Sequence, residues 1–143
     1  MQQTAFLALL SLLDFFPAAE RIKRVIPELL SMAESHPDYL LLLFAEQYGD
    51  LVTKLAALNH LGSDNAPVFL QSYAKLCAKD DIRLRQYCAY NFPATVKAFG
   101  GSYVPLLMDD LLVKLCNDPI EKVLASLGML RSTLSLNLFL LNL

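Results

Sequence analysis

The stretch that decides the fold of this chain lies at residues 75–89 and reads KLCAKDDIRLRQYCA. Apolar residues recur at helical spacing on both sides of a short polar run that includes Asp80 and Asp81. This pattern predicts the end of one amphipathic helix, a tight turn and the start of a second helix. A related segment, KLCNDPIEKV, begins at Lys114, so the Lys-Leu-Cys triplet of residues 75–77 recurs 39 residues later. A period of about 40 residues with a turn between two helices is typical of helical-hairpin solenoids.

The prolines give the same period independently. Three segments, IPELL, APVFL and VPLLM, begin at Ile26, Ala66 and Val104, and their prolines are 40 and 38 residues apart. Proline is favoured in the first turn of a helix, where its missing N–H is not needed, so each segment is expected to open the first helix of a repeat. We therefore predict an all-α fold, a right-handed α-α superhelix of about three helical hairpins with one leading helix.

The whole chain is expected to be one such domain. We predict a leading helix at residues 3–16, repeats at about 17–61, 62–101 and 102–135, and an apolar tail at 136–143. The leading helix is apolar on nearly all sides. It is therefore expected to be the second helix of a repeat whose first helix is missing, or to lie between two neighbouring helices.

The spacing within the repeats predicts which side chains are buried. In the first helix of the first repeat, the predicted apolar face is formed by Ile22, Ile26, Leu29, Leu30 and Ala33. In the first helix of the second repeat, it is formed by Phe69, Leu70, Tyr73, Leu76 and Cys77. Gly49 is expected to mark a bend in the second helix of the first repeat. Pro93 is expected to kink the next second helix, which Gly100 and Gly101 end.

The composition favours either a membrane protein or a part of a larger assembly. Hydrophobic residues make up 55% of the chain and charged residues 18%, compared with about 25% charged in a typical soluble domain. The longest uncharged runs, 1–13 and 132–143, are shorter than the roughly 20 residues that span a bilayer. The net charge of −2 and the lack of a basic tract argue against nucleic acid. We expect a protein partner and no membrane.

The cysteines and histidines show no catalytic or metal-binding spacing. Three cysteines, Cys77, Cys88 and Cys116, form no CxxC pair, and we expect them to be reduced and buried in a protein of the cytoplasm or nucleus. His36 and His60 lie beside turns without a second ligand nearby and are expected to be exposed to solvent.

The carboxylates and glycines do not form a reaction centre either. Adjacent helical residues such as Asp109 and Asp110 point about 100° apart, and Asp110 is instead expected to pair with Lys114. The pair of glycines at 100–101 lacks the spacing of a phosphate-binding loop. We predict no catalytic residues, no cofactor and no metal, and therefore no enzyme.

The charged turns remain as candidate binding residues. The candidates are Lys79, Asp80, Asp81, Arg83 and Arg85 of one turn, with Asn117 and Asp118 of the next. Two interpretations are open. The side chains can form local salt bridges that stack adjacent repeats, or they can line a ridge that presents charge to a partner protein.

Three segments resemble known repeat proteins over about residues 20–130. DDIRLR at 80–85 is similar to the Asp-x-x-Val-Arg element of HEAT repeats, although Val123 or Leu124 replaces that arginine in the third repeat. YLLLLFAEQYG at 39–49 looks like a repeat segment of the scaffold A subunit of protein phosphatase 2A. YNFPA at 90–94, followed by an aliphatic run and a glycine, is similar to regulatory subunits of serine/threonine-protein phosphatase 4.

This resemblance implies a non-catalytic scaffold or regulatory subunit. Such a subunit would bind a phosphatase catalytic chain or a regulatory chain through the turns at 35–38, 79–83 and 117–120, and this chain would be part of a longer platform. One alternative is a HEAT-repeat adaptor for transport or assembly machinery. Another is a secreted or membrane-tethered protein that uses residues 1–16 as its targeting segment.

Overall fold

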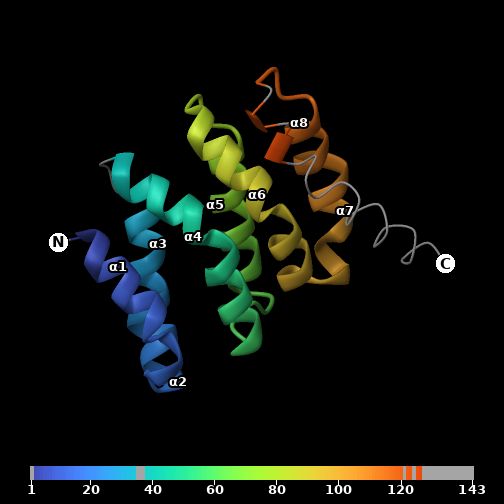
Figure 1. Cartoon of the computed structure of the whole chain (residues 1–143). Coiled ribbons are helices and arrows are strands. Elements are labelled where there is room, and N and C mark those ends of the chain that lie inside the picture. Colours follow the sequence, from blue (N-terminus) through green and yellow to red (C-terminus); the bar gives the residue numbers. More distant parts are fainter. Residues whose placement is uncertain (1, 35–37, 121, 124, 127–143) are drawn as a thin grey trace.

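The computed structural model describes residues 2–34, 38–120, 122, 123, 125 and 126 (Figure 1). All regular elements in this part of the chain are helical, which confirms the prediction of an all-α protein. The apolar tail at 136–143 and nearly all of the second helix of the third repeat lie outside the described residues, and so does His36.

The helices follow one another with short connections. The order is α1 (Gln2–Ser11), η1 (Leu13–Phe15), α2 (Ala18–Glu20), η2 (Arg21–Val25), α3 (Ile26–Glu34), α4 (Asp38–Ala57), α5 (Ala66–Cys77), α6 (Ile82–Phe99), η3 (Gly101–Tyr103), α7 (Val104–Leu106), η4 (Leu107–Leu112) and α8 (Val113–Cys116). From α2 to α3 and from α7 to α8 the helix continues without a break, and η2 and η4 are wider π-helical turns inside these two runs.

The helices are arranged in two layers. In Figure 1, α1, α4 and α6 lie toward the viewer, and α3 and α5 lie behind them. Helix α4 packs along α6, α3 packs against α4, and α5 packs against α6. Each hairpin is therefore stacked on the next through the contact of α4 with α6.

An aromatic column joins three of these helices through the core. The ring centroids of Phe6 and Phe44 are 6.0 Å apart, those of Phe44 and Tyr48 5.7 Å, and those of Tyr48 and Tyr73 4.9 Å. The hydroxyl of Tyr48 donates to the carbonyl of Phe69 at 2.8 Å, and that of Tyr73 donates to the carbonyl of Cys88 at 2.6 Å. Burial raises the pKa of both tyrosines well above its ordinary value, so both stay neutral donors.

The second repeat buries the residues that its spacing predicts. The buried face of α5 contains Phe69, Leu70, Tyr73, Leu76 and Cys77. Helix α6 begins after Asp81, whose carboxylate accepts the backbone N–H of Arg83 at 2.9 Å, and it continues through Pro93. It ends at Gly100, whose φ of +75° favours glycine over other residues.

The first repeat differs from its prediction because of η2. Ile22 is 58% exposed, and Val25 is buried in its place. A π-helical turn contains an extra residue, and Ile22 lies within this turn, so its side chain is rotated out of the phase that the later apolar face sets. Pro27 also lies inside this helical run, directly after the wide turn, whereas Pro67 and Pro105 lie in first turns as expected. Proline cannot donate to the carbonyl four residues earlier, and the wide turn provides the space that its ring requires.

The leading helix is covered on one side only. It ends at Ser11 and is followed by η1, so it is shorter than predicted, and it packs on α3 and α4. Phe6 and Leu10 are buried, whereas Leu7, Leu12 and Phe15 are 41%, 48% and 81% exposed. Among the described residues, no helix combines the length and the apolar character needed to cross a membrane.

Candidate functional site

The charged turns predicted from the sequence meet at one edge of the molecule. Arg85 Nε lies 2.6 Å from Asp118 Oδ2, and the two side chains are only 15% and 6% exposed. A second guanidinium nitrogen, Nη1, donates to the carbonyls of Lys79 and Asp80 at 2.8 Å each. Arg85 therefore ties the turn between α5 and α6 to the turn after α8, as the stacking interpretation requires.

Asp118 is held in its charged form by this arrangement. Burial alone would raise the pKa of the carboxyl group. Hydrogen bonds from Arg85 and from the backbone N–H of Ile120, at 2.9 Å, outweigh burial, and the pKa lies below its ordinary value. A buried carboxylate with a charged partner and a backbone donor is typical of a positioned structural group.

The other predicted residues of the edge are more exposed. Arg83 binds Asp81 through two nitrogens at 3.1 Å and 2.8 Å, and its side chain is 65% exposed. The hydrogen bond from Arg83 is the main reason why the pKa of Asp81 lies below its ordinary value. Lys79, Asp80 and Asn117 are exposed beside this pair. The accessible part of the edge therefore carries both signs of charge.

One polar contact was not predicted and corrects an expectation. His60 is buried, with 7% of its surface exposed, rather than lying in solvent. Arg21 Nε donates to His60 Nε2 at 2.9 Å, and Arg21 Nη1 donates to the carbonyl of Phe16 at 2.9 Å. Burial, and secondarily the charge of Arg21, lowers the pKa of His60, so the ring is an uncharged acceptor. The sequence carries no signal for this contact, because the two residues are 39 positions apart and neither belongs to a motif.

The contact between α4 and α6 is unusually close at Gly49. A Cβ atom added to Gly49 would lie 2.6 Å from Oδ1 of Asn91 and 3.2 Å from Cβ of Ala94. Asn91 Nδ2 donates to the carbonyls of Ala45 at 2.8 Å and Glu46 at 3.2 Å. Helix α4 changes direction about midway along its length (Figure 1). The segments 39–49 and 90–94 thus pack directly against each other.

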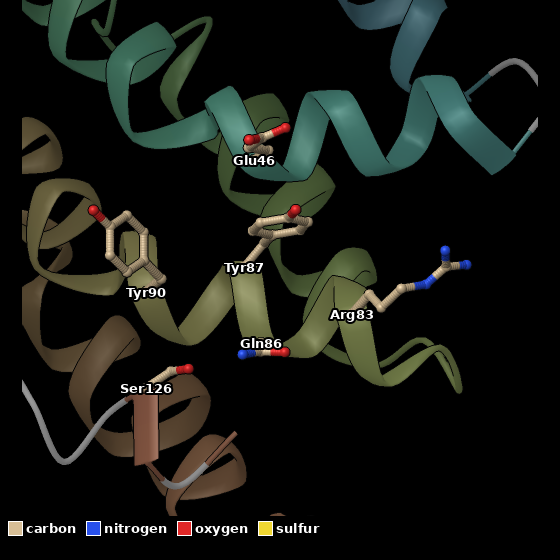
Figure 2. A pocket seen from close by; sticks show the side chains of 6 residues that line it. All are labelled: Glu46, Arg83, Gln86, Tyr87, Tyr90 and Ser126. Atoms are coloured by element: carbon tan, nitrogen blue, oxygen red, sulfur yellow. The ribbon is translucent and has the colours of Figure 1, made fainter. Parts of the chain in front are cut away.

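A groove opens beside this contact. It has a volume of about 380 Å³. Figure 2 shows the described residues that line it, which are Glu46, Arg83, Gln86, Tyr87, Tyr90 and Ser126. Sequence reasoning missed this surface, although two tyrosines three residues apart on one helix are a signal that could have indicated it.

In the part of the chain that the structure describes, no group of three or more histidine, cysteine or acidic side chains could hold a metal ion. Asp110 and Lys114 form the predicted exposed ion pair at 3.0 Å. Comparison of the sequence and the structure with protein-family models, curated proteins and solved structures finds no match.

Proposed function

We propose that this chain is a segment of a right-handed HEAT-type helical solenoid and serves as a non-catalytic scaffold or regulatory subunit of a serine/threonine protein phosphatase. The observation that supports this most is the ion pair of Arg85 with Asp118. It fixes two consecutive turns relative to each other and so creates one continuous edge. A rigid edge of stacked turns suits a binding platform, because little ordering entropy is lost when a partner docks.

The residues of the edge have two roles in this proposal. Arg85 and Asp118 position the turns, since they are largely buried and bind each other. The contacts with the phosphatase catalytic chain or a regulatory chain are assigned to the more exposed Lys79, Asp80, Asp81, Arg83 and Asn117. Exposed charges of this kind determine the association rate and the choice of partner more than the total affinity.

The test is capture of a phosphatase catalytic chain of the 2A or 4 type by the purified protein. Arg83→Glu reverses an exposed charge, and a glutamate in the first turn of α6 suits the helix dipole, so the fold is retained. We expect at least about a tenfold loss of binding. The matched control is Arg24→Glu, because Arg24 is 75% exposed and lies in η2, away from this edge. Full binding by a folded Arg83→Glu variant, or no capture by the unchanged protein, would contradict the proposal.

The alternative function is a HEAT-repeat adaptor for another complex, such as transport or assembly machinery. The groove between α4 and α6 favours this alternative, because it lies on a helix layer and is lined by Tyr87 and Tyr90. An adaptor would bind its partner through the groove and ignore phosphatases. Binding that survives Arg83→Glu but is lost in Tyr90→Ala would identify this second mode.

A further inference from the structure

The carboxylate of Glu46 lies at the rim of the groove, where no ion pair with another described residue engages it. Glu46 is exposed on α4, next to the point where Asn91 holds the backbone of that helix. Among the described residues, the acidic partners in ion pairs are Glu20, Asp81, Asp118 and Asp110, and Glu46 is not one of them. Asp50, also exposed, lies one helical turn further along α4 and adds a second negative charge to the same side.

Two aromatic rings stand beside this carboxylate. Figure 2 shows Tyr87 and Tyr90 rising from α6 toward α4, which carries Glu46. Tyr90 is 68% exposed, so its ring is accessible from the groove. The faces of aromatic rings carry a negative partial charge and attract cations within about 6 Å of the ring centre.

Among the described residues that line the groove, Arg83 is the one cation, and it is paired with Asp81. The guanidinium of Arg83 is held by both carboxylate oxygens of Asp81 and extends away from Glu46 (Figure 2). It therefore leaves the space between Glu46 and the tyrosines with a net negative character. A volume of about 380 Å³ is near the lower end of ordinary ligand sites, which suits one long side chain and its backbone.

From this arrangement we infer that the groove between α4 and α6 binds a lysine or arginine side chain of a partner polypeptide. The cationic head pairs with Glu46, and its methylene stem packs on the rings of Tyr87 and Tyr90. Tyrosine is enriched among the energetically dominant residues of protein interfaces. The inference does not rest on the proposed phosphatase partner, because Glu46, Tyr87 and Tyr90 lie outside the edge formed by the two charged turns.

The test uses the full chain and short fluorescein-labelled peptides in fluorescence polarisation. One peptide alternates lysine with serine, and three counterparts carry arginine, glutamate or leucine in place of lysine. The lysine and arginine peptides are expected to bind, more weakly at raised ionic strength, and the glutamate and leucine peptides are not. No binding of either cationic peptide, or equal binding of the leucine peptide, overturns the inference.

Variants assign the binding to the three residues. Glu46→Lys is expected to weaken binding of the lysine peptide by about tenfold or more, since a favourable charge contact becomes a repulsive one. Tyr90→Ala is expected to weaken it about three- to fivefold, whereas Tyr90→Phe, which keeps the ring, retains it. The matched control is Glu28→Lys, the same charge change at an exposed site of α3. An equal loss in Glu28→Lys would show binding by net charge alone and would refute the site.

The same variants test whether a second copy of this chain occupies the groove. Size-exclusion chromatography of the unchanged protein over a range of concentrations measures self-association. If the protein associates with itself, and Glu46→Lys and Tyr90→Ala both abolish that association, the groove is an interface between copies and the inference about a separate partner is wrong. Self-association that both variants leave unchanged assigns it to another surface and agrees with the inference.

Discussion

Replacing Gly49 by alanine is expected to destabilise the protein, although alanine is the better helix former. In an open helical position this change would stabilise by about 1 kcal/mol. Here the new Cβ atom would lie 2.6 Å from Oδ1 of Asn91, closer than two such atoms approach, so the Asn91 side chain must move. Its movement gives up the hydrogen bonds to the carbonyls of Ala45 and Glu46, each worth about 1 kcal/mol.

The net effect follows from these opposing terms. Overpacking of a tight contact costs about 1–3 kcal/mol, and about 1–2 kcal/mol is added for the hydrogen bonds that Asn91 loses. Against this stands the gain of about 1 kcal/mol from helix propensity. We expect a loss of about 2 kcal/mol in the free energy of unfolding, or a decrease in Tm of about 4–8 °C for a chain of this size.

The measurement is urea unfolding of a double-mutant cycle with Asn91→Ala. That variant removes the atom that collides with the new methyl group, so the double variant should be more stable than the sum of the two single changes predicts, by about 1 kcal/mol. Gly62→Ala is the matched control, because an added Cβ there meets nothing within 4 Å. A Gly49→Ala variant as stable as the parent, or strictly additive effects, would refute the close α4–α6 packing.

Three further outcomes are expected. Arg85→Ala should lower the free energy of unfolding in urea by about 3 kcal/mol, since it leaves the buried carboxylate of Asp118 without its cation. The pKa of His60 is lowered in the folded protein, so the neutral ring stabilises the fold. This stabilisation is complete above the ordinary histidine pKa of about 6.5 and is lost as the pH falls through the lower pKa of the folded state. A His60→Gln variant should therefore show a smaller loss of unfolding free energy over this pH range. In the native protein Cys88, buried and with a pKa raised by burial, should resist a thiol-specific reagent, whereas the half-buried Cys116 should react first.

The sequence was sufficient where the deciding interactions are local. The buried face of α5 and the cap at Asp81 follow from spacing and from one side chain beside its own helix. The position of Ile22 could not be predicted, because a single π-helical turn changes the phase of a stripe without leaving a mark in the apolar pattern. His60 was misplaced for a different reason, since its burial depends on Arg21 from a distant helix.

For the candidate binding residues too, local features could be predicted from the sequence and contacts between distant segments could not. The residues of the turn edge were all found from the sequence, but spacing could not tell that Arg85 and Asp118 bind each other while Arg83 stays exposed. The groove was missed because it depends on α4 and α6 lying side by side. That contact in turn depends on Gly49 and Asn91, which lie more than one repeat apart.

The aromatic column has a consequence for how the chain can be divided. In many repeat proteins each unit contacts only its neighbour, and terminal units fray or can be removed with little effect on the rest. Here Phe6 of α1, Phe44 and Tyr48 of α4 and Tyr73 of α5 form one unbroken series of ring contacts, and the Tyr73 hydroxyl extends it to the backbone of α6. The helices from α1 to α6 should therefore exchange their amide hydrogens as one cooperative unit. A shortened protein that retains this unit must include the leading helix and must extend at least to Phe99, the last residue of α6.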